Sequence, residues 1–114
     1  MPTTTPESAL PVIEAFCDRR VPEHVRDEVP LECSRRGNSI TISERRPPWR
    51  VDFGPAWSEL KVAQLRYEPS DGTWSLYCRD RNERWFLYDV IEPATSVVPL
   101  LTEINEDPTG IFWG

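Results

Sequence analysis

The chain has 114 residues, of which 39% are hydrophobic and 28% are charged, a composition typical of one globular domain. Five Trp, four Phe and three Tyr supply large apolar anchors, which argues against disorder despite the 12 Pro. The net charge of −6 argues against anionic membranes and disfavours nucleic acid without excluding it, and no apolar run approaches the roughly 20 residues of a membrane-spanning helix.

The N-terminal region is predicted to be a short frayed lead-in over residues 1–8, followed by a single domain over residues 9–114. The first residues have neither the basic start nor the apolar stretch of a signal peptide. Ser8 is a candidate N-cap, and Pro22 is expected to end the helix because the residue before a proline avoids helical geometry. Apolar residues then recur at helical spacing: Ala9, Ile13, Phe16 and Cys17.

The three cysteines, Cys17, Cys33 and Cys78, are odd in number and widely spaced, a pattern that indicates no disulfide framework. They do not form the close C-x2-4-C pair of a zinc site. Each lies on a predicted apolar face, where a free cysteine commonly behaves as a small buried hydrophobe. We therefore expect a cytoplasmic protein with no metal and no cofactor.

A first hairpin is predicted over residues 31–43, with Gly37 permitting the positive φ of a tight turn. Pairing Arg35 with Asn38 places Cys33 opposite Ile40. In this register four apolar side chains share one face of the hairpin: Leu31, Cys33, Ile40 and Ile42.

Residues 44–61 are predicted to form a long connection without regular structure, because three Pro and one Gly interrupt it. It lies within the basic middle of the chain, residues 35–66, and contains four candidate binding residues: Arg45, Arg46, Trp49 and Arg50. Guanidinium groups beside an indole can bind an anion or stack on an aromatic ligand. Alternatively, Trp49 anchors the connection in the core and the arginines pair with acids elsewhere, so that the basic middle and the acidic ends neutralise one another.

A three-stranded meander is predicted over residues 62–88, with reversals at 69–72 and 80–83. The simplest register stacks Leu65, Leu76 and Leu87 on one apolar face and sets Cys78 opposite Trp85. The other face then carries three aromatic side chains together with Arg66: Tyr77, Phe86 and Tyr88. Either this second face is covered by the 44–61 connection or a helix, or it is a binding surface.

The C-terminal region is predicted to contain a helix capped by Ser96. Its apolar residues recur at helical spacing: Val97, Leu100, Leu101 and Ile104. The terminal residues 112–114 are expected to fill a groove on their own domain, or alternatively to dock onto a partner.

Evidence for catalysis in the sequence is weak. His24 is the single histidine and lies in a polar stretch, which favours a surface position over a catalytic base. Asp52, Glu59 and Lys61 resemble the end of a metal-dependent nuclease motif, in which two acids hold the metal ion and a lysine orients water. The pattern is short, so a chance match is the favoured interpretation. Asp80 is explained by a turn, in which its side chain bonds its own backbone.

Several segments in combination resemble a bacterial family known as domain of unknown function 3024. They are Val21-Pro22 with Val25-Arg26, Glu44–Trp49, Ala63-x-Leu65-Arg66-Tyr67, Trp74–Tyr77, Arg79–Asn82, Trp85-x-x-Tyr88 and Asp107–Gly114. The resemblance covers about residues 14 to 114 and implies a small stand-alone bacterial protein. It implies no activity, cofactor or site residue.

We therefore expect a two-layer α+β fold, with about five antiparallel strands and two helices packed on the apolar face. The leading functional hypothesis is a small non-catalytic binding or adaptor protein that recognises an anionic or protein partner through the Arg/Trp segment and the aromatic face. The alternatives are a small metal-dependent hydrolase or nuclease that uses clustered carboxylates, and a structural homodimer that buries the aromatic face.

Overall fold

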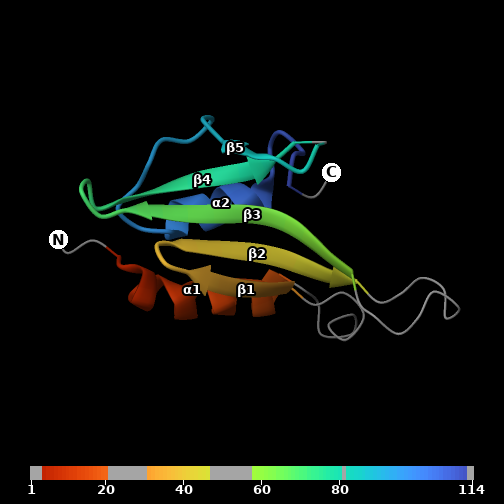
Figure 1. Cartoon of the computed structure of the whole chain (residues 1–114), viewed down its shortest axis with the longest axis horizontal. Coiled ribbons are helices and arrows are strands. Elements are labelled where there is room, and N and C mark those ends of the chain that lie inside the picture. Colours follow the sequence, from red (N-terminus) through yellow and green to blue (C-terminus); the bar gives the residue numbers. More distant parts are fainter. Residues whose placement is uncertain (1–3, 21–30, 47–57, 81, 113–114) are drawn as a thin grey trace, which may run out of the picture.

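The computed structural model describes residues 4–20, 31–46, 58–80 and 82–112. Two helices and five strands follow one another along the chain: α1 (Pro6–Arg20), β1 (Leu31–Arg36), β2 (Ser39–Arg46), β3 (Ser58–Glu68), β4 (Thr73–Arg79), β5 (Trp85–Leu87) and α2 (Val98–Glu106). The strands form one antiparallel sheet in the order β1-β2-β3-β4-β5, and both helices lie on the same side of it (Figure 1). This is the predicted two-layer α+β fold.

Helix α1 begins at Pro6, so Ser8 lies in its first turn and is not the N-cap that the sequence predicted. Thr5 and Ser8 form a reciprocal cap: the backbone N–H of Thr5 donates to Ser8 Oγ over 3.0 Å, and that of Ser8 donates to Thr5 Oγ1 over 3.4 Å. Proline suits the first helical position because its fixed φ is helical and no N–H is needed there. The carbonyl of Thr4 accepts a 2.7 Å hydrogen bond from the indole of Trp74, so part of the predicted lead-in is anchored to the sheet.

The first hairpin has the predicted strands but a register two residues away from the predicted one. Arg36 pairs with Ser39 and Cys33 pairs with Ile42, so Gly37 and Asn38 form a two-residue turn. Gly37 has a φ of +62°, the value that a glycine-led hairpin turn requires. Because side chains alternate with a period of two, this shift exchanges partners but leaves every apolar residue on the predicted face.

Strands β2 and β3 extend into the connection that was predicted to be irregular. Strand β2 continues to Arg46, which pairs with Ser58 at the start of β3. The register shifts between Ile42 and Ser43, because Val62 is an additional residue in β3 and forms a β-bulge. Arg45 and Arg46 are therefore strand residues and not part of a loop, while residues 47–57 lie outside the described part of the chain.

The second hairpin has the predicted register. Leu65 pairs with Leu76 and Tyr67 pairs with Trp74, and the connecting turn comprises the four predicted residues 69–72. Leu65, Leu76 and Trp74 are almost completely buried, since their side chains face the two helices. The predicted inward face of β3 and β4 is thus confirmed.

The third hairpin is shifted by one residue from its predicted register, and the prediction was wrong there. Cys78 pairs with Phe86 and Tyr77 pairs with Leu87, whereas Cys78 was expected opposite Trp85. Glu83 has a φ of +64°, and the N–H of Asp80 bonds the carbonyl of Arg84, so the loop holds three residues instead of four. A shift by one residue exchanges the two faces of a strand, so Leu87 points away from the helices and is 49% exposed.

Helix α2 carries the predicted apolar stripe into the core. Val97, Leu100, Leu101 and Ile104 are all buried, and they pack in one cluster with the inward residues of α1 and the sheet. Ser96 lies one residue before the N-cap, Val97, and its hydroxyl accepts the N–H of Val98 over 3.1 Å. Phe112 is buried against Tyr88, with ring centroids 5.0 Å apart. Residues 112–114 were expected to pack on their own domain, and Phe112, the one of them that the structure describes, does so.

Candidate functional site

The face of the sheet that points away from the helices carries polar side chains at alternate positions of the central strands. Because Leu65 and Leu76 point inward, their neighbours in sequence point outward. Strand β2 contributes Thr41, β3 contributes Gln64 and Arg66, and β4 contributes Ser75 and Tyr77. Figure 1 views the sheet from this side, with both helices behind it.

These outward side chains form a chain of contacts across the three central strands. The amide nitrogen of Gln64 donates to Thr41 Oγ1 over 2.9 Å, and Arg66 Nε donates to Gln64 Oε1 over 2.6 Å. The guanidinium carbon of Arg66 lies 3.8 Å from the centroid of the Tyr77 ring, close enough for a cation–π interaction. Two neighbours thus position the guanidinium of Arg66: Gln64 accepts its Nε–H, and the Tyr77 ring lies next to its central carbon.

Arg66 and Tyr77 line an open hollow of about 670 Å³. The segment that precedes α2 runs along the edge of β4, where Trp74 pairs with Ala94, and Pro93 forms one rim of the hollow. The remaining lining residues come from the two adjacent turns and from strands β2 to β4: Asn38, Ser39, Gln64, Tyr67, Glu68, Asp71, Thr73 and Ser75.

The charges around the hollow are mixed, because Glu68 and Asp71 share it with Arg66. The carboxylate of Glu68 is engaged by Ser70, whose hydroxyl donates to Oε1 over 2.9 Å. Within residues 4–20, 31–46, 58–80 and 82–112, no carboxylate lies within ion-pair distance of Arg66. A planar guanidinium with free terminal nitrogens can bind a carboxylate or phosphate through two parallel hydrogen bonds.

Of the eight candidate binding residues named from the sequence, the structure brings only two together, Arg66 and Tyr77. Arg45 and Arg46 end β2, but their side chains lie outside the described part, and so do Trp49 and Arg50.

Phe86 and Tyr88 do not share a face with Tyr77, contrary to the prediction. Phe86 pairs with Cys78 and lies on the inward face at the edge of the sheet, where it is 40% exposed. Tyr88 is 4% exposed, and its hydroxyl donates to Glu103 Oε2 on α2 over 2.8 Å. Burial, the largest contribution, raises the pKa of Tyr88. The physical reason is the one-residue shift at the third hairpin, which turns these two side chains toward the helices.

The outward positions of β5 belong instead to Trp85 and Leu87, which the sequence analysis assigned to the core. Leu87 pairs directly with Tyr77, and the guanidinium carbon of Arg79 lies 5.4 Å from the Trp85 ring centroid. The outward face thus continues from Arg66 and Tyr77 to an exposed leucine. A signal was present in the sequence, because Asp80 and Asn82 favour a compact turn, but it does not distinguish a three-residue from a four-residue loop.

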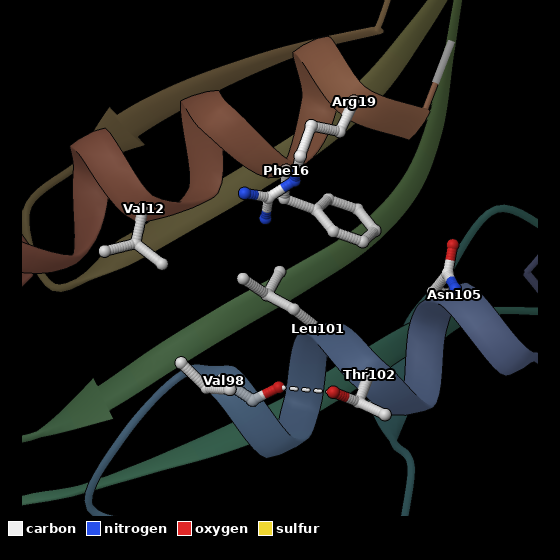
Figure 2. Close-up of a pocket in the computed structure, with 7 residues that line it drawn as sticks. All are labelled: Val12, Phe16, Arg19, Val98, Leu101, Thr102 and Asn105. Carbon is white, nitrogen blue, oxygen red and sulfur yellow. Dashed lines mark hydrogen bonds between the residues drawn. The ribbon is translucent and has the colours of Figure 1, made fainter. Parts of the chain in front are cut away.

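A second hollow, of about 340 Å³, lies between the two helices on the opposite side of the molecule. Figure 2 shows Phe16 of α1 and Leu101 of α2 facing each other across it, with the guanidinium of Arg19 beside Phe16. Val12 and Val98 lie toward one end of the groove, and Asn105 lies toward the other. Thr102 does not present a free hydroxyl donor there, since its Oγ1 bonds the carbonyl of Val98 over 3.1 Å (Figure 2). This groove lacks the oriented charged group that the sheet hollow has.

Neither a metal site nor a membrane-spanning helix is found in the described ranges. No group of three or more His, Cys, Asp or Glu side chains there is arranged to hold a metal ion. None of the helices in these ranges combines the length and the apolar character that crossing a bilayer requires. Asp80 Oδ1 accepts the backbone N–H groups of Asn82 and Arg84 at 2.8 and 2.9 Å, which confirms its predicted turn role.

Comparison with known proteins identifies the family. A family model described as "Domain of unknown function (DUF3024)" matches residues 1–114. The chain belongs to the DUF3024 family. The resemblance predicted from the motifs is therefore confirmed, and the match covers the whole chain. No curated protein and no solved structure matches it.

Proposed function

We propose that this DUF3024 protein is a small non-catalytic binding module that holds a carboxylate of a protein partner at Arg66. One observation carries the proposal: the guanidinium of Arg66 is stacked on Tyr77 and oriented by Gln64, while no carboxylate of the described chain pairs with it. A preorganised guanidinium loses little conformational entropy on binding, so its bidentate bond to a carboxylate is strong for an exposed site.

The charges of the hollow favour a carboxylate over a phosphate. Asp71 and Glu68 line the same space as Arg66, and the whole chain carries a net charge of −6. A dianionic phosphate would be repelled by these acids more strongly than a singly charged carboxylate would. The same repulsion disfavours nucleic acid as the partner, as the net charge already did.

An apolar contact next to the charged one supports a polypeptide partner. Leu87 lies directly opposite Tyr77 on the outward face and is 49% exposed. An acidic side chain that reaches Arg66 can therefore bring a neighbouring apolar side chain onto Leu87 and Tyr77, where burial adds affinity. We infer that the partner segment combines acidic and apolar residues.

The proposed setting is the bacterial cytoplasm. The three cysteines are free, which suits a reducing compartment. The segment containing Arg45, Arg46, Trp49 and Arg50 stays part of the hypothesis as a second contact, because these residue types suit an anionic partner.

Neither alternative function is favoured by an observation on the described residues. The carboxylate of Asp80 accepts two backbone N–H groups of its own turn. Asp52 and the side chain of Glu59 lie outside the described part of the chain. The homodimer hypothesis relied on a continuous face of Tyr77, Phe86 and Tyr88. That face does not exist in the described structure, since Tyr88 is buried beneath the sheet.

The proposal is tested by titrating the isotope-labelled protein with capped peptides that alternate glutamate and leucine, followed by nuclear magnetic resonance. We expect the Nε signal of Arg66 and the amide signals of Gln64 and Tyr77 to shift. Peptides with glutamine in place of glutamate should leave them unshifted. Arg66→Gln should weaken binding about tenfold or more, because a charge-assisted hydrogen-bond pair is lost.

The matched control is Arg19→Gln, which removes the same charge in the groove between the helices. Equal weakening by the two variants would mean that only net charge matters and would contradict the site. Inorganic phosphate that binds Arg66 as tightly as the glutamate peptide would contradict the preference for a carboxylate. A dimer in light scattering that Arg66→Gln and Leu87→Ser abolish would replace the partner by a second copy of the chain.

A further inference from the structure

The sheet has two edges, and the chain covers them unequally. At one edge β5 has only three residues, and beyond it the segment that precedes α2 covers β4, where Trp74 pairs with Ala94. At the other edge β1 runs for six residues, and no strand of the described chain pairs with its outer side. Natural sheets protect such an edge with lysine, proline, a bulge or a covering segment. Strand β1 contains neither lysine nor proline, and the bulge of this sheet lies in β3.

The register determines which residues of β1 direct their backbone groups to the open edge. Neighbouring residues of a strand direct these groups to opposite sides. The carbonyl of Asn38 accepts the N–H of Tyr67 on β3 over 2.7 Å, so the next residue, Ser39, directs its groups to β1, where it pairs with Arg36. Alternation along β1 then directs the N–H and C=O groups of three residues to the open edge: Leu31, Cys33 and Arg35. No hydrogen bond to these groups is seen among the described residues.

Helix α1 flanks this edge with acidic side chains. It lies behind β1, runs antiparallel to it (Figure 1), and packs more extensively against β1 than against any other strand. Ile13 is buried against the sheet, and Val12 and Phe16 line the groove toward α2. Because a helix has about 3.6 residues per turn, the side of α1 away from α2, which is the side of the open edge, carries three exposed acids: Glu7, Glu14 and Asp18.

The helical side of the edge also offers apolar surface. Three side chains there pack against the core but are only partly buried: Leu10, Leu31 and Cys33. Lysine suits a position above them, because its methylene stem packs on apolar surface while its ammonium group reaches a carboxylate. The inward-pointing charge of β1, Arg35, lies at the turn end of the strand, where its Nε donates to the Gly37 carbonyl over 3.0 Å. The basic side chains of an added strand are therefore expected opposite Leu31 and Cys33.

A second copy of the chain is disfavoured as the occupant of this edge. A two-fold axis that continued the sheet would set two β1 strands about 4.8 Å apart, with an α1 helix behind each. Packed helices keep their axes about 8–10 Å apart, so the two helices would overlap, and their acidic sides would face each other. An isolated extended segment brings no helix and avoids both conflicts.

We propose that the outer edge of β1 binds an extended, lysine-containing segment of a partner protein as an additional antiparallel strand. Backbone hydrogen bonds from β1 supply affinity, and the acidic side of α1 selects lysine at alternate positions of the partner. This inference does not rest on the carboxylate site, since no residue of β1 lines the hollow at Arg66.

The test adds a capped peptide of alternating lysine and threonine to the isotope-labelled wild-type protein and follows amide hydrogen exchange by nuclear magnetic resonance. In the free protein the amides of Leu31, Cys33 and Arg35 should exchange fast, whereas those of Ser34 and Arg36, which are directed to β2, should exchange slowly. Peptide at about ten times its Kd should slow the fast amides about tenfold, because only the unbound fraction exchanges. Unchanged exchange at these amides would overturn the proposal.

Methylated peptides separate backbone pairing from charge attraction. In an antiparallel pair, the peptide residues that bond Leu31 and Cys33 lie directly opposite them and face the helical side, so they are the lysines. Methylation of the lysine backbone nitrogens should weaken binding by about tenfold or more, since hydrogen bonds to β1 are lost. Methylation at the threonines, whose N–H groups point away from β1, should change the affinity about twofold or less. Equal binding of the two methylated peptides would contradict an added strand.

Charge variants test the chemistry of the partner. Glu14→Lys should weaken binding of the lysine peptide about fivefold, because it replaces attraction by repulsion at the edge. The matched control is Glu106→Lys, which makes the same change at the exposed end of α2 and should change the affinity about twofold or less. Equal weakening by the two variants would contradict the role of α1. So would a peptide with glutamate in place of lysine that binds equally well.

Two further measurements separate this edge from other surfaces. Arg66→Gln should leave binding of the lysine peptide unchanged, so failure of the edge and failure of the carboxylate site are distinguishable. A dimer in light scattering whose amides at Leu31, Cys33 and Arg35 are protected without peptide would overturn the proposal and make a second copy the occupant.

Discussion

The hydroxyl of Tyr88 donates a 2.8 Å hydrogen bond to Oε2 of Glu103 and so connects the end of the sheet to helix α2. The same side chain packs on Phe112, which holds the C-terminal segment against this corner of the core. A residue that the sequence placed on a binding surface is therefore a structural connection between three parts of the fold.

We expect Tyr88→Phe to lower the free energy of unfolding by about 1 kcal/mol, because one hydrogen bond to a charged acceptor is lost while the ring packing stays. Urea unfolding followed by tryptophan fluorescence measures the change. Tyr77→Phe is the matched control, since no hydrogen bond of the Tyr77 hydroxyl is seen among the described residues, and its effect should stay within about 0.5 kcal/mol. Equal effects of the two variants would contradict the structural role of the Tyr88 hydroxyl.

Gly37→Ala should destabilise the protein by about 1 kcal/mol through the backbone alone. Gly37 has a φ of +62°, and a Cβ built at this position meets nothing within 4 Å, so no steric contact contributes. Asn38→Ala, at the second residue of the same turn, is the control, because the backbone bond from Tyr67 N–H to the Asn38 carbonyl is retained. A turn that tolerates alanine equally well at both positions would disagree with this conformation.

Asp80→Ala should lower the stability by about 1–2 kcal/mol, because one carboxylate oxygen accepts two backbone N–H groups of the third hairpin loop. Asp80→Asn keeps an acceptor oxygen and should retain most of the stability. Glu92→Ala removes the same charge at another exposed position and serves as the control for net charge. If Asp80→Asn were as destabilising as Asp80→Ala, charge and not loop geometry would be the cause.

The stability of the protein should fall between pH 9 and about pH 11, partly because of Cys78. Burial, followed by the carboxylate of Asp89, raises the pKa of the Cys78 thiol from 9.0 to about 11. Below pH 9 the thiol is protonated in both states; above it the unfolded chain loses the proton first, which favours unfolding. The contribution of Cys78 is thus complete below pH 9 and lost as the pH rises through about 11.

Cys78→Val, which nearly conserves volume, should show a smaller decrease in unfolding free energy between pH 8 and pH 11 than the wild type. Urea titrations at a series of pH values give the comparison, and all other ionisable groups are shared by the two proteins. Parallel pH profiles would show that Cys78 does not contribute to the alkaline loss of stability.

Local patterns in the sequence were sufficient for the element types, the inward faces of both helices and the register of β3 and β4. The spacing of Ile13, Phe16 and Cys17 defines one helical face, and the turn at residues 69–72 has the predicted four residues, since Glu68 pairs with Thr73. The neighbourhood of Arg66 and Tyr77 follows from that register, because Tyr77 pairs with Gln64 and so lies diagonally across from Arg66.

The register of the other two hairpins was decided by the tertiary structure. In the first hairpin a shift by two residues keeps every side chain on its face, so alternation cannot detect it. In the third, the three-residue loop requires a positive φ at Glu83, which local propensity does not predict. This register turns Tyr88 toward α2, where its hydrogen bond to Glu103 stabilises the arrangement. Contacts between distant elements, such as Tyr88 with Glu103, form only when the helices dock, because alternation and helical spacing specify which way a side chain points but not which residue it meets.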